Sequence, residues 1–368
     1  MKHFVNPLKR LDRYIIVKFI GTYIFAILLI ISISIVFDFN QNMAKFANNH
    51  APWRAIIVDY YANFIPYFAN LFSPLFVFIA VIFFTSKLAG NSEIIAMLAS
   101  GTSFRRLLRP YMLSAALIAG INYYLGAYVI PNGNIVRQNF ETQYKNKKKN
   151  TSASNVQLQV GPGVIAYIQQ YDNNAKRGYG FALYKFDQKK LVSHMTANVI
   201  QYDTISDERN HWKASNYKIR TLKGLREKIE TGSEIDTLIM MEPMDLVYSK
   251  GQQEQFTSPD LKRYISKQQE RGSTNVVQYE VEYHKRIATS FASFILTIIG
   301  ASLSARKRKG GMGLALGIGL ALSFTYILLQ TVSATFATQA NLPPMLAAWI
   351  PNILYVFIAY FCYRQAPN

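Results

Sequence analysis

Few side chains in this sequence are arranged as catalytic or metal-binding groups usually are. No glycine-rich segment ends in Lys-Ser or Lys-Thr, the loop that binds nucleotide phosphates, so the sequence does not predict a conventional ATPase. The single cysteine, Cys362, excludes an internal disulfide and a cysteine-based metal site. We interpret the adjacent Ser193 and His194 as strand residues rather than as a catalytic pair. The histidines, none of which has metal-ligand spacing, are His3, His50, His194, His211 and His284. We therefore expect no catalytic residue, and no metal or cofactor bound by this chain.

A short apolar segment between Gly90 and Gly101 has the residue pattern of a capped helix. Asn91 or Ser92 can cap its start, and Glu93 falls in the first turn, where the helix dipole favours a negative charge. Gly101 can end the helix in the left-handed conformation. Such a helix either rests on the lipid interface or docks into a motor subunit, and spacing alone does not choose between the two.

Long stretches without a charged residue predict that the chain crosses a membrane several times. Half of the residues (50%) are hydrophobic and only 17% are charged. No Asp, Glu, Lys or Arg lies between residues 59 and 87, between 109 and 137, or from 310 to 363. A spanning helix needs about 20 mostly apolar residues, so each gap holds at least one. The first apolar run is too long for a signal peptide and lacks a cleavage site, so we expect it to remain as a helix. The predicted spans are 14–37, 61–86, 111–130, 284–304, 311–335 and 344–363.

The short loops predict the orientation of these spans. Basic residues gather in the N-terminal tail and in the loops after the second and fourth spans, which the positive-inside rule places in the cytoplasm with both termini. The net charge of +19 does not indicate nucleic-acid binding, because the basic residues form no aromatic-interleaved patch. The residues that set the orientation are Lys2, Lys9, Arg10, Arg13, Lys87, Arg105, Arg106, Arg109, Arg306, Lys307, Arg308 and Lys309.

The middle of the chain, residues 137–282, belongs to a different solvent environment. It holds most of the acidic residues, and alternating stretches such as 164–168 and 179–186 indicate an antiparallel β sandwich or jelly-roll-like sheet. The run Lys145 to Lys149 is predicted to be a flexible, solvated approach to it. The predicted fold is a membrane α-helical protein with six transmembrane helices in two sets of three and an inserted periplasmic antiparallel β domain. The predicted domains are 1–136, with the first three spans and a short cytoplasmic helix at about 91–100, then 137–282, the β domain, and 283–368, the last three spans.

Four short motifs, in this order and spacing, resemble the LptF/LptG (YjgP/YjgQ) family of permeases. The resemblance covers nearly the whole chain, including the arrangement of three spans, a β domain and three spans. The Leu-Asp-Arg-Tyr start favours the LptG-like half. The motifs are Leu11-Asp12-Arg13-Tyr14-Ile15, Ser92-Glu93-Ile94 with Ala99-Ser100-Gly101, Pro131-Asn132-Gly133, and Asn341-Leu342-Pro343-Pro344.

This resemblance implies a function and a set of partners. Such proteins pair with a sister six-span permease (LptF- or LptG-like) and sit on a cytoplasmic ATPase dimer (LptB-like), which uses the ATP. The assembly extracts lipopolysaccharide from the outer leaflet of the inner membrane and passes it to a periplasmic bridge protein (LptC/LptA-like). The family's short helix docks into the ATPase, so the residues implied to couple to it are Glu93, Ile94, Met97 and Leu98.

The resemblance is weaker where the first span meets the periplasm. Family members often present lysines there for the lipid A phosphates, whereas this sequence has Phe37-Asp38-Phe39. We expect Lys45 and Arg137 to act as substitutes, because a phosphate at the interface needs a partly desolvated cation; loop charges that only touch solvent or phospholipid are the alternative. Ile168 and Phe181, at inward-facing strand positions, are the residues we expect to line a periplasmic lipid path.

Two other classes of function stay open at this stage. A secondary transporter needs ion-coupling carboxylates inside the membrane, and no acidic residue follows Glu282. A non-transporting membrane scaffold would use its external domain only to recruit partners. Copurification distinguishes these classes, because an ATPase and a second permease should accompany only the transport subunit.

Overall fold

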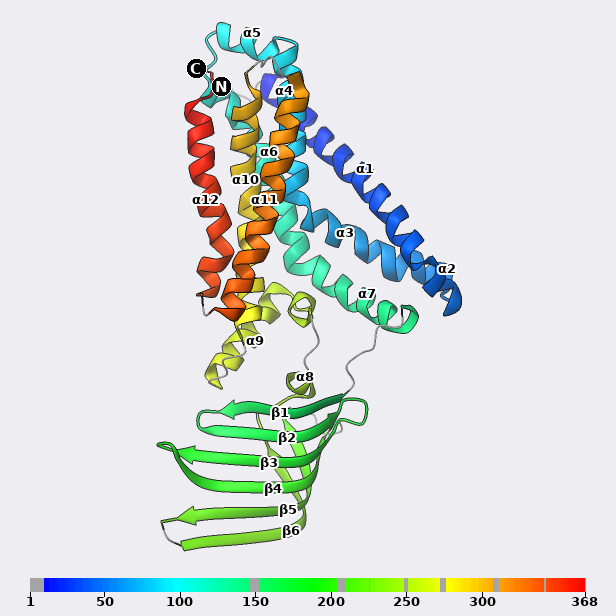
Figure 1. Ribbon diagram of the computed structural model, residues 1–368, viewed down its shortest axis with the longest axis vertical. Helices are drawn as coiled ribbons and strands as arrows, with labels where there is room; N and C mark the ends of the chain where they lie inside the picture. Colours follow the sequence, from blue (N-terminus) through cyan, green and yellow to red (C-terminus); the bar gives the residue numbers. More distant parts are fainter. Residues whose placement is uncertain are drawn as a thin grey trace, which may run out of the picture. The chain divides into compact units, whose positions relative to one another are not determined.

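The structure is a computed structural model that describes residues 10–145, 152–203, 210–224, 226–247, 251–271, 276–306, 311–340 and 342–367. It divides into two compact units, one helical and one mostly β (Figure 1). The helical unit takes its residues from 1–146, 253–259 and 277–368, and the β unit from 147–252 and 260–276. Residues named above that lie outside the described ranges are Lys2, His3, Lys9, Lys147, Lys148, Lys149, Lys307, Arg308, Lys309 and Asn341.

Six segments of the helical unit are long and apolar enough to cross a membrane, and a six-stranded sheet is inserted between the third and the fourth. The predicted fold class is therefore confirmed. The third segment is a long helix with an internal π-helical turn, so the helix continues beyond the predicted end of that span at residue 130. The segments are α1 (Arg10–Asn48), α4 (Ser73–Gly90), α6 (Phe104–Tyr124) continued by η2 (Leu125–Val129) and α7 (Ile130–Tyr144), α10 (Val277–Ser304), α11 (Gly311–Gln339) and α12 (Pro344–Arg364).

The helices differ strongly in how much of their surface the unit itself covers. Helix α10 packs against α4, α6 and α12, and α11 packs against α4 and α12. Small residues permit this close approach: a Cβ at Gly300 would lie 3.0 Å from Val81 of α4, and one at Gly319 would overlap Ile82. In α4, 72% of the span residues are buried, against 17% in α1 and 22% in α11. Helices α1 and α11 therefore keep a broad apolar surface outside the unit.

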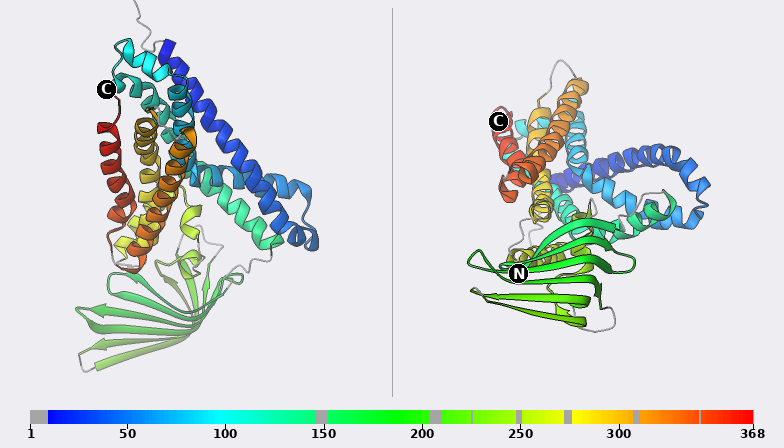
Figure 2. Two further views of the ribbon diagram at one scale, coloured as in Figure 1. Left: turned by 45° about the horizontal axis from the view of Figure 1, so that its top comes forward. Right: turned by 60° about the horizontal axis from the view of Figure 1, so that its bottom comes forward.

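The second predicted span, 61–86, is divided in two. Helix α3 (Ala62–Leu71) ends at Phe72, which leaves the helical conformation (φ −96°, ψ 6°), and Pro74 follows near the start of α4. Because Pro74 has no N–H, it cannot continue the hydrogen-bond pattern of α3, and the chain changes direction between α3 and α4. After this break α3 lies with the second half of α1 and with α7 in an arm that stands apart from α10, α11 and α12 (Figures 1 and 2). The short α2 (Trp53–Ala55) and η1 (Ile56–Tyr61) connect α1 to α3 at the end of the arm.

An aromatic cluster with a carboxylate inside it holds the arm together. The hydroxyls of Tyr60 and Tyr61 each donate to Asp38 at 3.1 Å. The ammonium of Lys145, from the residue after α7, lies 3.9 Å from the Asp38 carboxylate and 4.0 Å from the centre of the Tyr60 ring. The Lys145 side chain is only 8% exposed, so the prediction that it is solvated and flexible is wrong. Its two carboxylate neighbours, Asp38 and Glu141, compensate the burial of its charge.

The inserted β domain is a single antiparallel sheet whose strands follow chain order, β1-β2-β3-β4-β5-β6 (Figure 1). The antiparallel, jelly-roll-like domain that the sequence predicts is confirmed in this form. Every pair of neighbouring strands is antiparallel, and in such a sheet one face can bury the apolar side chains while the other meets water. The strands are β1 (Ser152–Gly161), β2 (Val164–Asp172), β3 (Arg177–Asp187), β4 (Lys190–Tyr202), β5 (His211–Lys223) and β6 (Arg226–Leu238).

A crease crosses the sheet where every second strand has a left-handed residue. These residues are Asn155 in β1 (φ 53°), Gly180 in β3 (φ 65°) and Asn216 in β5 (φ 53°), and the ladder pairing skips them and the residues that face them on the adjacent strands. In β3, Gly178 is buried before the crease, whereas Phe181 and Leu183 are buried in the core after it, so the inward positions change from even to odd numbers there. Asparagine and glycine are the residues that adopt this conformation most readily. The crease therefore reverses which residues of a strand face the core.

The crease should make Gly180 sensitive to substitution. Gly180→Val should destabilise the sheet by about 1–3 kcal/mol, because a β-branched residue is strained at positive φ and its Cβ would lie 2.8 Å from that of Gln169. Hydrogen exchange of the β2–β4 amides in the full chain should accelerate about tenfold or more. Asn216→Gly, which keeps the left-handed conformation accessible, is the control and should exchange like the parent. Unchanged exchange in Gly180→Val would show that the backbone does not need this conformation.

The apolar face of the sheet is covered within the β unit. Trp212 is fully buried and its indole N–H donates to the carbonyl of Met241 at 2.9 Å. Residues 239–247, which include α8 (Pro243–Leu246), pack against it, and a buried ion pair between Asp245 and Arg271 (2.8 Å) ties α8 to the end of α9 (Ser258–Glu270). The core of this unit is therefore closed in the structure.

Candidate functional site

The predicted short helix is present as α5 (Glu93–Ala99), between α4 and α6. Ser92 occupies the N-cap position in the left-handed conformation, with its side chain making no capping bond. The Glu93 carboxylate instead accepts hydrogen bonds from the side chains of Asn91 (3.1 Å) and Tyr14 (3.4 Å). Gly101 follows at φ 83°, so its predicted left-handed conformation at the helix end is confirmed. The helix is thus defined at both ends by neighbouring residues.

The two faces of α5 have different environments. Ile94 is fully buried in the core formed by α1, α4 and α6, and Met97 and Leu98 are partly buried against the same core. Ile95, next to Ile94 in the sequence, is 53% exposed. Of the predicted coupling residues, Ile94, Met97 and Leu98 therefore anchor the helix, while Glu93 lies at its start. Ile95 on the outer face was missed because a run of six apolar residues (94–99) does not reveal which side is covered.

A half-buried ion pair joins the starts of α1 and α6 next to α5. The guanidinium of Arg106, in the first turn of α6, donates both its NH groups to the Asp12 carboxylate of α1, each at 2.7 Å. Asp12 is buried, and a bidentate pair of this kind fixes orientation as well as distance. The starts of α1 and α6 are thereby held together directly beside the α4–α5 turn. Two residues of the Leu-Asp-Arg-Tyr motif thus form contacts at this end of the helical unit. Asp12 accepts the hydrogen bonds of Arg106, and Tyr14 donates to Glu93.

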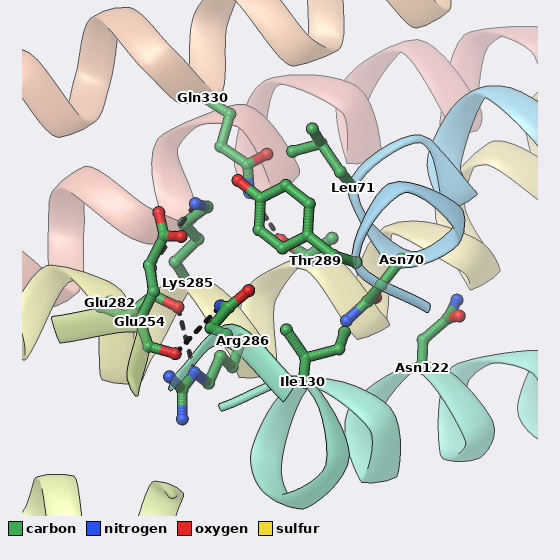
Figure 3. Close-up of a pocket in the computed structure, with 13 residues that line it drawn as sticks. Asn70, Leu71, Asn122, Ile130, Glu254, Glu282, Lys285, Arg286, Thr289 and Gln330 are labelled. Atoms are coloured by element: carbon green, nitrogen blue, oxygen red, sulfur yellow. Dashed lines mark hydrogen bonds and ion pairs between the residues drawn. The ribbon is translucent and has the colours of Figure 1, made fainter. Parts of the chain in front are cut away.

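At the other end of the helical unit, four charged side chains line one side of a cavity of about 80 Å³ (Figure 3). Glu282 of α10 lies 3.0 Å from the Arg286 guanidinium and 3.5 Å from the Lys285 ammonium. Glu254 of η3 (Gln252–Gln255) faces the same space. Burial raises the pKa of the Glu254 carboxyl above its ordinary value, and the nearby Glu282 carboxylate raises it further. Burial therefore favours the neutral form of the Glu254 carboxyl.

Arg286 also binds residues 253–258, the segment that precedes α10 in the helical unit. Its NH groups donate to the carbonyl of Phe256 (2.9 Å), the hydroxyl of Ser258 (3.2 Å) and the carbonyl of Gln253 (3.4 Å). The Asn134 amide of α7 donates to the Glu254 carbonyl at 3.2 Å. One guanidinium therefore fixes residues 253–258 against α10. Sequence reasoning missed this role, although an arginine inside an apolar helix is itself a signal of buried pairing.

The two cations predicted to bind phosphate lie in different surroundings. Arg137 of α7 is half-buried, with its guanidinium carbon 4.3 Å above the centre of the Tyr67 ring, and its charge opposes the rise in the pKa of Glu254. The Arg137 charge thus acts on the charged side chains of the cavity, although Arg137 is not one of the residues that line it. Lys45 is exposed in the last turn of α1. The structure therefore brings Arg137, but not Lys45, into a cluster of charged groups.

The predicted lipid-path residues are paired inside the sheet. Ile168 of β2 lies opposite Phe181 of β3 in the ladder, and both are buried in the core that residues 239–247 cover. Tyr179, two residues before Phe181, is 44% exposed because the crease at Gly180 reverses the strand face. An acyl chain reaches Ile168 and Phe181 only if the covering segment moves aside.

These features define a multi-pass membrane protein with an inserted β domain, and with a short, firmly anchored helix outside the spans at one end. Residues 13–365 match the sequence profile of the family described as "Lipopolysaccharide export system permease LptF/LptG", and the chain belongs to this family. A pairwise sequence comparison with individual curated proteins finds no match. The chain is accordingly an inner-membrane permease of lipopolysaccharide export, a transport subunit rather than a typical enzyme. That it is the LptG-like half stays a prediction.

Proposed function

We propose that this chain is one half of a permease pair driven by a separate ATPase dimer. In this proposal the pair extracts lipopolysaccharide from the outer leaflet of the inner membrane and passes it to a periplasmic bridge protein. The chain itself binds no cofactor, and ATP is used by the ATPase. The observation that carries the proposal is the outer face of α5, where an apolar residue, Ile95, is exposed on a helix whose opposite face is buried.

The anchoring of α5 suits it to receive mechanical work. Ile94 seats the helix in the core, Tyr14 bonds to Glu93, and the Asp12–Arg106 pair fixes the adjacent helix ends. A displacement applied to such a helix moves α1, α4 and α6 with it, because packed interiors do not deform continuously. An interfacial helix that only rests on lipid does not require this ion pair between α1 and α6.

The proposed orientation places α5 in the cytoplasm. The first turn of α1 and the last turn of α12 lie at the same end of the helical unit as α5 (Figures 1 and 2). The arginines Arg13, Arg105 and Arg109 belong to this end, in agreement with the positive-inside rule. The β domain then lies in the periplasm.

Cysteine labelling tests this orientation. With Cys362 replaced by serine, a cysteine at Arg306 should react with a membrane-impermeant reagent only from the cytoplasm, and a cysteine at Lys223 only from the periplasm. The physical reason is the cost of moving clustered basic residues across the membrane. If both positions are labelled from the same side, the six-span topology is wrong.

The uncovered helices α1 and α11 support a pairing with the sister permease. Both expose long apolar faces, and a Cβ at Gly313 or Gly317 of α11 would meet nothing within 4 Å. Faces with small residues let a second helix approach closely. Copurification tests the proposed function directly: the tagged chain should retain an ATPase and a second six-span permease. A chain that retains neither under mild solubilisation would favour the scaffold alternative.

For the substrate we propose that Arg137 and Lys45 meet lipid A phosphates and that acyl chains pass along the inner face of the sheet. A photoreactive side chain at Ile168 or Phe181 should then capture lipopolysaccharide during ATP-driven turnover. The same group at Tyr179, on the opposite face beside the crease, is the matched control and should capture much less. If active transport leaves no lipid adduct at any inward position, the domain only recruits partners.

A further inference from the structure

A second, larger cavity lies on the outside of the helical bundle, among α6, α10 and α12. It has a volume of about 770 Å³, within the range of about 300–1,000 Å³ typical of ligand sites. Ala359 of α12 (6% exposed), Leu108 of α6 (8%) and Ile295 of α10 (9%) are the most buried lining residues and form its floor. Leu113 of α6 and Val356 of α12 are each 52% exposed and form its rims. The cavity is therefore an apolar groove open along one side.

Two arginines one helical turn apart, Arg105 and Arg109 of α6, line the same groove. Both are exposed, and within the described part of the chain neither forms an ion pair. Arg106, between them, is turned toward Asp12 and neutralised by it. The groove thus combines an apolar channel with two cations on one rim that the described part of the protein does not use.

The lining residues argue against a transmembrane helix as occupant. Helix interfaces in membranes favour small residues that allow backbones to approach, whereas this groove is lined mostly by large apolar side chains, among them Leu108, Met112, Ile298 and Tyr360. A basic pocket between transmembrane helices matches an anionic lipid head group instead. We propose that the groove binds one anionic glycerophospholipid, with its phosphate between Arg105 and Arg109 and an acyl chain along Ile298 and Val356.

This site is separate from the charged cavity around Glu282 and from the sheet interior, so it goes beyond the proposed export function. It lies at the end of α6 that carries α5, which the proposed orientation places in the cytoplasmic leaflet. The exported lipid starts from the opposite leaflet. A phospholipid bound here fills the space beside the first turns of α6. Arg106 in the same turns pairs with Asp12 of α1, next to α5.

Lipid binding by the purified full chain tests this proposal without ATP or transport. The chain is delipidated in detergent and titrated with phosphatidylglycerol or phosphatidylcholine of the same acyl composition, and bound lipid is counted by native mass spectrometry. The parent should prefer phosphatidylglycerol about tenfold, because its head group has a net negative charge, whereas the choline cation of phosphatidylcholine offsets the charge of its phosphate beside two arginines. Arg105→Gln with Arg109→Gln should remove this preference, whereas Arg13→Gln, another exposed arginine near the same end, should keep it. Val356→Trp, which fills the groove without altering its charge, should reduce binding of both lipids.

Three results would overturn the proposal. The first is equal binding of the two lipids by the parent, and the second is an unchanged preference in the double arginine variant. The third is displacement of phosphatidylglycerol by purified lipopolysaccharide at equal concentration, which would assign the groove to the exported lipid. Because the measurement needs neither ATPase nor turnover, its failure leaves the proposed export function intact, and failure of copurification leaves the lipid site intact.

Discussion

Ile95→Asp should abolish stable association with the ATPase while the chain still folds and inserts. Ile95 is 53% exposed on α5, so the substitution disturbs no core contact, yet it places a charge in the centre of the proposed interface. Loss of a buried apolar anchor and burial of an unpaired charge together should weaken binding by about 2–5 kcal/mol, or about 30-fold or more. The affinity of the ATPase for the detergent-solubilised permease measures this effect.

Ile94→Ala is the matched control, because it changes the neighbouring residue on the opposite face of the same helix. Ile94 is fully buried, so this substitution should lower the free energy of unfolding of the chain by about 2–5 kcal/mol. The chain that remains folded should bind the ATPase like the parent. If Ile95→Asp binds the ATPase like the parent, α5 rests on lipid and the coupling proposal fails.

Substitutions of Glu93 separate its charge from its shape. The carboxylate favours the helix start by only about 0.3–1 kcal/mol, and its hydrogen bonds to Asn91 and Tyr14 are exposed. Glu93→Gln keeps the size and can still accept both bonds. A loss of ATPase binding in Glu93→Gln as large as in Glu93→Ala would assign the effect to a cation on the ATPase; two parent-like variants would leave Glu93 as a helix-start residue only.

Arg286→Met should be the most destabilising substitution among the charged residues of the helical unit that the structure describes. It removes the closer of the two cations that pair with Glu282, and three hydrogen bonds to residues 253–258. Because Glu282 is then left with only the more distant Lys285 and the carbonyls of the segment lose their donor, the expected loss is about 3–5 kcal/mol. Thermal unfolding of the purified chain should show it, and the segment 253–258 should become accessible to protease.

A double-mutant cycle identifies the cause of this loss. Adding Glu282→Gln to Arg286→Met should recover part of the stability, because the remaining group is then neutral. Lys285→Met is the control: its side chain is 36% exposed, so its pair with Glu282 should be worth only about 0–1 kcal/mol. An Arg286→Met variant as stable as Lys285→Met would show that the cluster does not hold residues 253–258.

The local features that the sequence predicts correctly each depend on one segment. Charge-free runs of about 20 residues are sufficient for a spanning helix because lipid offers no partner to charges or to the open backbone. Gly101 ends α5 in the predicted left-handed conformation because few other residues adopt it without strain. The alternating stretches of residues 164–168 and 179–186 likewise form the strands β2 and β3.

What the sequence did not determine depends on contacts between distant segments. The exposure of Ile95 rather than Ile94 follows from how α5 packs on α1, α4 and α6, and hydrophobicity is the same at both positions. The burial of Lys145 requires Asp38, 107 positions earlier in the chain, to be carried to it by α1. Neither the exposure of Ile95 nor the burial of Lys145 can be predicted from the residues adjacent to it in the sequence.

In the sheet, the alternation of the sequence does not predict which face each side chain lies on. Strict alternation would place Tyr179 and Phe181 on the same face, but the left-handed Gly180 between them sends Tyr179 outward and Phe181 into the core. Asn155 of β1 and Asn216 of β5 adopt the same left-handed conformation, and each lies at the position in its strand where the ladder pairing is interrupted. The sequence thus determined the spans, the short capped helix and the presence of an antiparallel domain, each set by solvent and local backbone preference. Tertiary structure alone decided which faces are buried and which charges meet, because those depend on free energies shared between segments far apart in the chain.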